Sequence, residues 1–553
     1  MPSRFLPATL RRSLLADARA RARTGKGHTP TLLAGAFLGL ASTLACVGPP
    51  ADLQQLLANG VFGQERDMSW HRGPRVAIGD SGPARFVTTL NQAFQLDRSM
   101  KLVRFQDRFY RAPGNDGYEA VLERLETELR AAGFGGADDR LTLSYLETDP
   151  EPIWNPKRGL VEIVLPDGDR RVLHSFDNEG ANDRVLLPIN APACDVTGRI
   201  ALKLEDLEEG MILVTEMPTH QVLQRAVNRG AAAIVSASLQ IFNNDPSGKD
   251  RHRDAIQYRI FRKPPSLPVA QISPRSFETI EAAWLRNPGR VELHLRADVE
   301  TQMRPLRTLV ATVVGSERPE EAVAMSSHVQ EPGASDNATG VAGLCESARN
   351  LAEVLQAGDL EWPARTVVFL WGDEFRQTED WLDATSLRPV IGISSDMTGQ
   401  SKETGAIALL ERMPDPGAVR PLAPDEHTPW GAGDVDAEDL QPNGLSIIAR
   451  CAMIDVGLGE PEGWECADHP WEGGSDHDIY IARGVPAILV WHFTDFTYHT
   501  SLDRLDFVDP DEMRRTAVAL LSTAMSVADP EPGDLDRYLQ SLTIEDADPE
   551  PIV

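Results

Sequence analysis

Five short segments in the second half of the sequence carry residue types that bind metal ions. Each sets an imidazole or a carboxylate among small or aromatic residues, and the five candidate ligands are His328, Asp336, Glu374, Asp396 and His499. Two imidazoles and three carboxylates suit a pair of zinc ions, which take nitrogen and oxygen ligands and keep a position for water. Two such ions a few ångström apart can activate that water and polarise a carbonyl. The segments therefore predict a hydrolytic centre that holds two metals.

The candidate ligands lie where strands are expected to end. Short apolar, β-branched runs of the kind that form buried strands occupy residues 321–327, 366–371, 390–395 and 485–491. His328, Asp373-Glu374 and Asp396 directly follow the first three runs, and His499 lies in the loop beyond the fourth. Open α/β sheets bind their ligands at the carboxyl ends of their strands. A single His or Asp is more often a hydrogen-bonded or surface residue, so the repeated placement favours a functional site.

Residues 301–527 resemble the catalytic domain of the zinc aminopeptidase and glutamate carboxypeptidase family. The segments that carry the resemblance are His-x-x-x-Pro-Gly-Ala-x-Asp-Asn-Ala-Thr-Gly at 328–340, Gly-Ser-Asp-His at 474–477 and Tyr-His-Thr-x-x-Asp at 498–503. The resemblance implies a three-layer α/β sandwich, with a mostly parallel mixed sheet and helices on both faces. It also implies a metallopeptidase that uses two zinc ions to hydrolyse peptide substrates.

The resemblance assigns a role to each candidate. Asp336 would bridge the two metals, His328 and Asp396 would complete one site, and Glu374 and His499 would complete the other. Asp373 would act as the general base that takes a proton from the attacking water. The main alternative for Asp336 is an N-cap, because a clear helical pattern follows it.

The chain departs from the family pattern at two positions near the expected metals. The family places glutamate where this chain has Asp373, which has the same chemistry but one methylene less reach. It also places an aspartate where this chain has Gln330, whose neutral amide is expected to accept a hydrogen bond from the His328 ring. Residues 475–477 read equally as a helix cap or as a network that steadies the site. Asp503 is expected either to orient His499 or to cap a turn.

The N-terminal segment predicts export. Seven basic residues precede an apolar stretch at 31–46 that ends in Thr-Leu-Ala-Cys, and this stretch is shorter than a spanning helix needs. The ending resembles a bacterial lipoprotein signal, in which Cys46 carries lipid and becomes the first mature residue. A plain cleaved signal is the alternative. We therefore expect a periplasmic or cell-envelope protein, with a possible lipid anchor at Cys46.

Composition excludes some classes of partner. The chain has 553 residues, 42% of them hydrophobic, so it can bury more than one core. Its formal charge of −29 argues against binding to nucleic acid or to anionic lipid. In an oxidising compartment the four cysteines beyond Cys46 allow up to two disulfides. Proximity favours a Cys451–Cys466 pair, whereas Cys345, in an apolar helical stretch, is expected to be a buried thiol.

The chain divides into six expected parts. The strand–helix–strand pattern before residue 300 resembles the protease-associated domain that is often inserted into this family, with restriction of substrate access or stability alone as its possible roles. The expected parts are a signal peptide at 1–46, a linker and irregular segment at 47–100, the N-terminal part of the peptidase domain at 101–150, the protease-associated domain at 151–300, the catalytic domain at 301–527 and an acidic mobile tail at 528–553.

The activity that we expect is that of an exported exopeptidase, with aminopeptidase favoured over carboxypeptidase. Two other functions stay open at this level. A non-catalytic binding protein could keep the same fold, but it would be expected to have lost metal ligands, and this sequence keeps all five. A glutaminyl cyclase has a similar fold with a single zinc, and the full set of ligands argues against it.

Overall fold

The computed structural model describes residues 80–177, 183–240, 251–411, 443–469, 473–493 and 495–547. The expected signal peptide, Cys46 and the first part of the expected linker lie outside these residues. In the part of the chain that is described, no helix combines the length and apolar character needed to cross a membrane.

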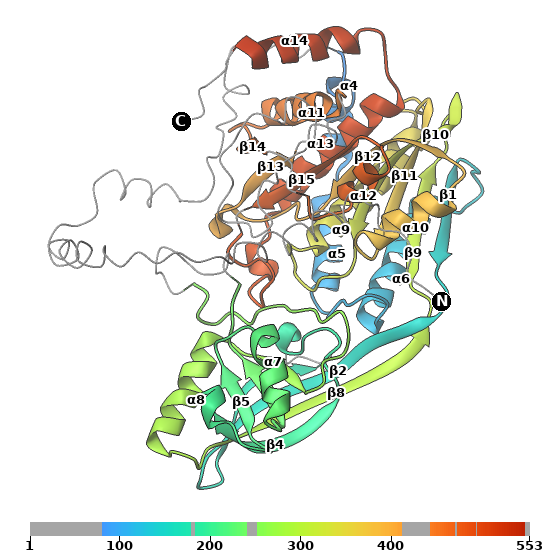
Figure 1. Ribbon diagram of the computed structural model, residues 1–553. Helices are drawn as coiled ribbons and strands as arrows, with labels where there is room; N and C mark the ends of the chain where they lie inside the picture. Colours follow the sequence, from blue (N-terminus) through green and yellow to red (C-terminus); the bar gives the residue numbers. More distant parts are fainter. Residues whose placement is uncertain are drawn as a thin grey trace, which may run out of the picture. The chain divides into compact units, whose positions relative to one another are not determined.

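An eight-stranded mixed sheet forms the centre of the larger lobe (Figure 1). In spatial order its strands are β1 (Leu141–Glu147), β9 (Arg307–Val313), β11 (Arg365–Gly372), β10 (Arg318–His328), β12 (Arg388–Ser395), β15 (Ala487–Phe493), β13 (Ile407–Glu411) and β14 (Cys466–His469). The four central strands β11, β10, β12 and β15 are parallel, and β1 and β9 pair antiparallel with their neighbours. Strand β13 pairs antiparallel with β15 and parallel with β14. Parallel pairing brings the carboxyl ends of the central strands to one edge of the sheet.

Helices cover both faces of this sheet, which confirms the expected fold class. Alternate residues of β10 face opposite sides: Val323 and Met325 pack into the larger core, and Ala322 and Ala324 pack into a smaller one. The larger core is built with α4 (Ala84–Ala93), α5 (Leu96–Gln106), α6 (Asp116–Ala131), α9 (Ala338–Ala357), α11 (Leu445–Gly459) and α13 (Pro510–Ala528). The smaller core is built with α10 (Arg376–Ala384) and α12 (His477–Ala482).

Helix α9 begins and ends where its sequence specifies. The Asn337 side chain accepts a hydrogen bond from Gly340 N–H at the N-terminus, and Gly358 ends the helix with a φ of 79°. Between them, Ala and Gly residues let the helix pack closely on the sheet, and nearly all of it is buried. The start of α9 therefore holds the loop before it, which contains Asp336, in a fixed position.

A second, seven-stranded sheet forms a smaller lobe between residues 151 and 304. In spatial order its strands are β3 (Arg170–Asp177), β2 (Glu151–Val164), β8 (Glu292–Arg304), β4 (Cys194–Ala201), β5 (Ile212–Thr215), β6 (Ala233–Ser236) and β7 (Val269–Gln271), accompanied by α7 (Thr219–Asn228) and α8 (Pro274–Arg286). The two long strands β2 and β8 pair antiparallel along their whole length (Figure 1). These strands and helices build a smaller α/β lobe, and its identity as an inserted protease-associated domain with the expected boundaries stays a prediction.

The structure differs from expectation at both ends of the described chain. Residues expected to be irregular form α4 and α5, because Phe86, Val87 and Leu90 supply a buried apolar face. Part of the expected mobile tail forms α14 (Asp534–Ala547). Asp534 accepts a hydrogen bond from Gly82 N–H at 2.6 Å, and Arg537 pairs with Asp455 of α11. Specific charged contacts thus order a segment that composition alone marks as mobile.

The expected disulfide between Cys451 and Cys466 is wrong. Both residues are buried and neither takes part in a disulfide, because they face different neighbours. Cys451 lies on α11 near the charge of Arg537, whereas the Cys466 thiol contacts the Trp464 carbonyl. Cys345 is a buried free thiol, as expected.

Candidate metal centre

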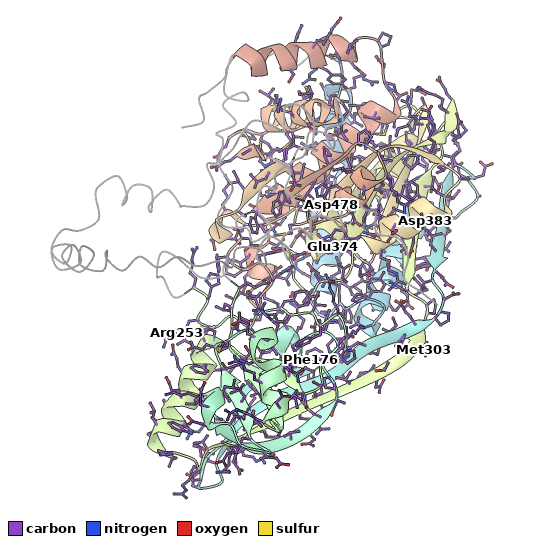
Figure 2. The ribbon with its side chains drawn as sticks, viewed as in Figure 1. Phe176, Arg253, Met303, Glu374, Asp383 and Asp478 are labelled. Carbon is purple, nitrogen blue, oxygen red and sulfur yellow. The ribbon has the colours of Figure 1, made fainter. Side chains whose placement is uncertain are left out.

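The parallel strands bring the five predicted ligands to one buried cluster. His328 is the last residue of β10 and lies beside Gly372, the last residue of β11, so Glu374 follows directly from the neighbouring strand end. His328 Nε2 lies 3.1 Å from Asp396 Oδ1, 3.9 Å from Glu374 Oε1 and 4.0 Å from Asp336 Oδ1. His499 Nε2 lies 3.2 Å from Asp336 Oδ2. Glu374, labelled in Figure 2, is the one ligand candidate shown there by name.

Two features of this cluster fit bound metal. Two sets of ligand atoms, His328–Glu374–Asp396 and His328–Glu331–Asp336, each lie within 4.8 Å of one another. His328 Nε2 and Asp396 Oδ1 are buried, and neither makes a hydrogen bond of normal geometry to any described residue. Such buried polar atoms are costly unless something satisfies them. A divalent cation would do so, and the mixed nitrogen and oxygen donors suit zinc.

The cluster carries an excess of negative charge, as a cation site requires. Burial lowers the pKa of His499, but the carboxylates of Glu331 and Asp336 outweigh it and raise that pKa to about 10. Burial and the charge of Glu331 raise the pKa of Asp336 well above its usual range. Without metal, protons therefore supply the positive charge that balances these carboxylates.

The backbone carbonyl of Gln330 orients His328. His328 Nδ1 lies 3.0 Å from this oxygen, so Nδ1 carries the proton and Nε2 is left to bind metal. The expectation that the Gln330 side chain contacts the ring is wrong. Its amide oxygen accepts a hydrogen bond from Glu374 N–H at 2.8 Å, and its amide nitrogen lies 3.3 Å from Glu374 Oε2. Gln330 thus holds Glu374, because the loop turns its side chain toward the end of β11.

Asp503 fixes the loop that carries Asp336. Its two carboxylate oxygens accept hydrogen bonds from Ser335 N–H at 2.7 Å and Asp336 N–H at 2.9 Å. A Cβ at Gly333 would collide with this carboxylate, which explains the glycine of the Pro-Gly-Ala segment. Asp503 therefore binds the backbone beside a ligand, which neither of its two expected roles described.

Residues 475–477 form a supporting network. Ser475 Oγ donates to Asp396 Oδ2 at 2.9 Å. Asp476 accepts hydrogen bonds from Phe375 N–H, Gln377 Nε2 and Thr378 Oγ1, and so ties the segment after Glu374 to α12. These contacts match the expected network that steadies the site and not the alternative of a helix cap.

Asp373, the expected base, adjoins Glu374 at the end of β11. Its side chain is half-buried, and burial raises its pKa to about 7 against the opposing charges of Arg376 and His328. A carboxylate with a pKa near neutrality suits proton transfer. The small cavity beside the cluster is lined by twelve described residues, among them Glu331, Asp336, Glu374, Asp396 and His499. Asp373 is not one of these lining residues. The role of Asp373 stays a prediction.

Two residues beside the cluster were not predicted. Glu331, only 7% exposed, lines the cavity and places Oε2 3.2 Å from His499 Nε2. Its sequence signal is an acidic residue directly before Pro-Gly-Ala, at a position that the family pattern leaves unspecified. Tyr258, from the inserted lobe, donates its N–H to the His499 carbonyl at 2.8 Å and sets its ring edge-on to the imidazole. The lobe therefore helps to hold His499.

Arg111 holds the loop between β10 and α9, and its removal tests that role. The buried guanidinium donates to the carbonyls of Val329, Gly333 and Gln106 at 2.9, 2.7 and 2.8 Å. Arg111→Met would leave these acceptors unpaired in the interior, so we expect the free energy of unfolding to fall by about 3 kcal/mol or more. Urea denaturation measures the change.

The matched control for Arg111→Met is Arg104→Met, which alters an exposed arginine on α5. It should change stability by less than about 0.5 kcal/mol. Equal unfolding of the two variants would contradict the structural role given to Arg111.

Comparison with known proteins agrees with this fold. Residues 308–374 match Peptidase family M28. The zinc aminopeptidase BSAP of Bacillus subtilis has the same fold, with a TM-score of 0.52 and 13% identity over 79% of this chain and 96% of that chain. The Peptidase M28 precursor of Shewanella amazonensis has a TM-score of 0.52 and 18% identity over 81% of this chain and 97% of that chain.

A curated relative extends the comparison to carboxypeptidases. It is described as "Probable glutamate carboxypeptidase AMP1" of Arabidopsis thaliana, and it is 23% identical over 312 residues. These residues are 48% of this chain and 39% of the relative, so the match spans well under half of the relative's length. The fold is that of these solved peptidases. Within residues 301–527, where the sequence resembles zinc peptidases, residues 308–374 are similar to peptidase family M28.

Proposed function

We propose that this chain is a zinc-dependent exopeptidase that binds two metals and acts as an aminopeptidase. The observation that carries the proposal is the convergence of two imidazoles and three carboxylates on one buried cluster. In this cluster His328 Nε2 and Asp396 Oδ1 make no hydrogen bond to any residue that the structure describes. The family match and the fold support peptide hydrolysis. The choice of aminopeptidase over carboxypeptidase rests on the solved zinc aminopeptidase with the same fold.

Each residue of the site has a distinct role in the proposed reaction. His328, Asp336, Glu374, Asp396 and His499 would hold the metals, which when bound supply a lowered pKa for a water and a polarised substrate carbonyl. Asp373 takes the proton of the attacking water and returns it to the leaving amine. Supporting contacts from Gln330, Asp503 and Ser475 keep the ligand side chains in place, so little reorganisation is needed at the moment of reaction.

A metal count joined to a peptide assay tests the proposal. We expect about two zinc ions per purified chain and hydrolysis of peptides that have a free amino end. Peptides blocked at the amino end should resist cleavage, because an aminopeptidase requires that end. Cleavage of amino-blocked peptides with a free carboxylate would point instead to a carboxypeptidase. Fewer than about one zinc per chain without hydrolysis would point to a binding protein, and cyclisation of N-terminal glutamine peptides would point to a glutaminyl cyclase.

We also propose that the chain is exported and anchored through lipid on Cys46. The basic residues, the apolar stretch at 31–46 and the cysteine that ends it support this proposal. Mass spectrometry of the mature N-terminus tests it. A lipidated Cys46 is the expected result, and a free, unmodified N-terminus created by cleavage elsewhere would contradict the anchor.

A further inference from the structure

Glu331 occupies the place of a ligand in the metal cluster. Its Oε2 lies 3.2 Å from His499 Nε2, the same nitrogen that faces Asp336 Oδ2 at 3.2 Å. Ligand atoms of Glu331, Asp336 and His328 also lie within 4.8 Å of one another. The side chain is nine-tenths buried and lines the cavity. The carboxylates of Glu331 and Asp336 thus converge beside His499, where the family pattern supplies Asp336 and a glutamate from the end of β11.

The backbone holds Glu331 in this position. Its φ of 79° lies in the left-handed region, which is unfavourable for a residue other than glycine. Two contacts with Arg111 keep the loop in place: Glu331 N–H donates to the Arg111 carbonyl at 3.1 Å, and the Arg111 guanidinium binds the carbonyls of Val329 and Gly333 on either side. The loop therefore directs the carboxylate inward, although an exposed side chain would be better hydrated.

Glu374, in contrast, lies on the other side of the cluster. The Glu374 carboxylate lies near the ligand atoms of His328 and Asp396. The Gln330 side chain holds Glu374 there by binding its backbone N–H and its Oε2. A second observation in the same cluster also points to a cation. His328 Nε2 is buried, faces these carboxylates and makes no hydrogen bond to a described residue.

We propose that Glu331 is a sixth protein ligand of the metal pair and binds the ion held by His499 and Asp336. The inference rests on the proposed function, since it assumes that the cluster binds two metals. Four carboxylates, those of Glu331, Asp336, Glu374 and Asp396, match the four positive charges of two divalent ions. The three carboxylate ligands of the family pattern would leave one of those four positive charges unbalanced. A fourth carboxylate also shifts the centre toward cations that prefer oxygen ligands, such as manganese.

Glu331→Gln tests the proposal, with Glu320→Gln as its matched control. Glutamine has nearly the same volume and removes a like charge from a crowded cluster, so the fold should be kept, and thermal unfolding of the metal-free proteins checks this. Glu320 is an exposed glutamate of β10, the strand that precedes the Glu331 loop, and its substitution should leave metal binding unchanged. The readouts are zinc stoichiometry after dialysis, the dissociation constant of each site by chelator competition, and the visible spectrum of the cobalt-substituted protein.

We expect the parent and Glu320→Gln to hold two zinc ions. Glu331→Gln should retain one and bind the other at least about 10-fold more weakly, because a neutral amide is a poorer ligand. Its cobalt spectrum should change at one of the two sites, and Glu331→Asp should recover part of the affinity. Two zinc ions bound by Glu331→Gln as tightly as by the parent would overturn the inference alone. In that case a raised KM for free-amine peptides would assign Glu331 to the substrate's amino group. Fewer than two ions in the parent would overturn the proposed function as well.

Discussion

Chelation of the bound metal is expected to abolish peptide hydrolysis by this chain, and added zinc is expected to restore it. The reason is that a bound cation is the strongest group available to polarise the substrate carbonyl. Among the described residues, those that line the cavity are mainly carboxylates, an imidazole and apolar side chains. An assay before and after dialysis against a chelator, and after zinc is returned, measures the effect. Chelator already saturated with zinc is the control. Activity that survives complete metal removal would show that the two-metal proposal is wrong.

The same experiment has a pH dependence whose sign is set by the imidazoles. Burial lowers the pKa of His328, but the charges of Asp396 and Glu374 raise it well above its usual range, and the pKa of His499 rises to about 10. The His499 imidazole is therefore protonated at pH 7 in the metal-free protein, and the raised pKa of His328 favours its protonated form. Both imidazoles must lose protons to bind zinc. Zinc affinity should rise with pH, and adding zinc in weak buffer should release protons. Affinity that is constant between pH 6 and 8 would contradict this assignment of charge.

Substitution of Asp373 by Asn is expected to lower turnover by roughly 10²–10⁴-fold, the usual effect of losing general acid–base catalysis. The amide cannot accept a proton, but the candidate ligands stay intact, so both metals should remain bound and KM should change less than kcat. A free carboxylate is needed, so kcat/KM of the parent should rise with pH through the pKa of Asp373. That pKa is about 7 without metal, and the positive charge of bound cations lowers it.

Two further variants separate Asp373 from its neighbour. Asp373→Glu restores the longer side chain that the family uses, and it should be active. Glu374→Gln should instead weaken metal binding, because it removes the charge of a ligand candidate. Zinc counts and steady-state kinetics on the three variants distinguish base from ligand. If Asp373→Asn turns over substrate at nearly the parental rate, another group is the base.

Local sequence patterns predicted the sheet and the residues at its strand ends. The apolar runs before His328, Asp373 and Asp396 indicate buried strands, and parallel strands in an α/β sheet deliver the residues after them to one edge. This placement depends on short-range periodicity and on the geometry of the sheet, both of which can be read from the chain. His328, Glu374 and Asp396 were therefore predictable from strand ends, whereas Asp336 and His499 were predicted from the resemblance to the family. The structure brings all five together.

Contacts between distant segments could not be predicted in this way. The direction of a loop side chain depends on what packs against it. Gln330 turns to Glu374, and Asp503 turns to the backbone of the Asp336 loop. Proximity in sequence likewise suggested a bond between Cys451 and Cys466, which face different neighbours. The ordering of α14 depends on contacts with residues more than 80 and 450 positions earlier in the chain.

Glu331 shows most clearly what the sequence by itself determined and what only the tertiary structure decided. The sequence places one acidic residue, among 83, before a Pro-Gly-Ala segment, and nothing local distinguishes it from a solvated surface charge. The tertiary structure sets it beside His499, 168 residues further along the chain. Strand-end ligands follow from periodicity, which is local. A ligand on a loop follows from the left-handed turn at Glu331 and from the buried contacts of Arg111, and these exist only once the whole domain has folded.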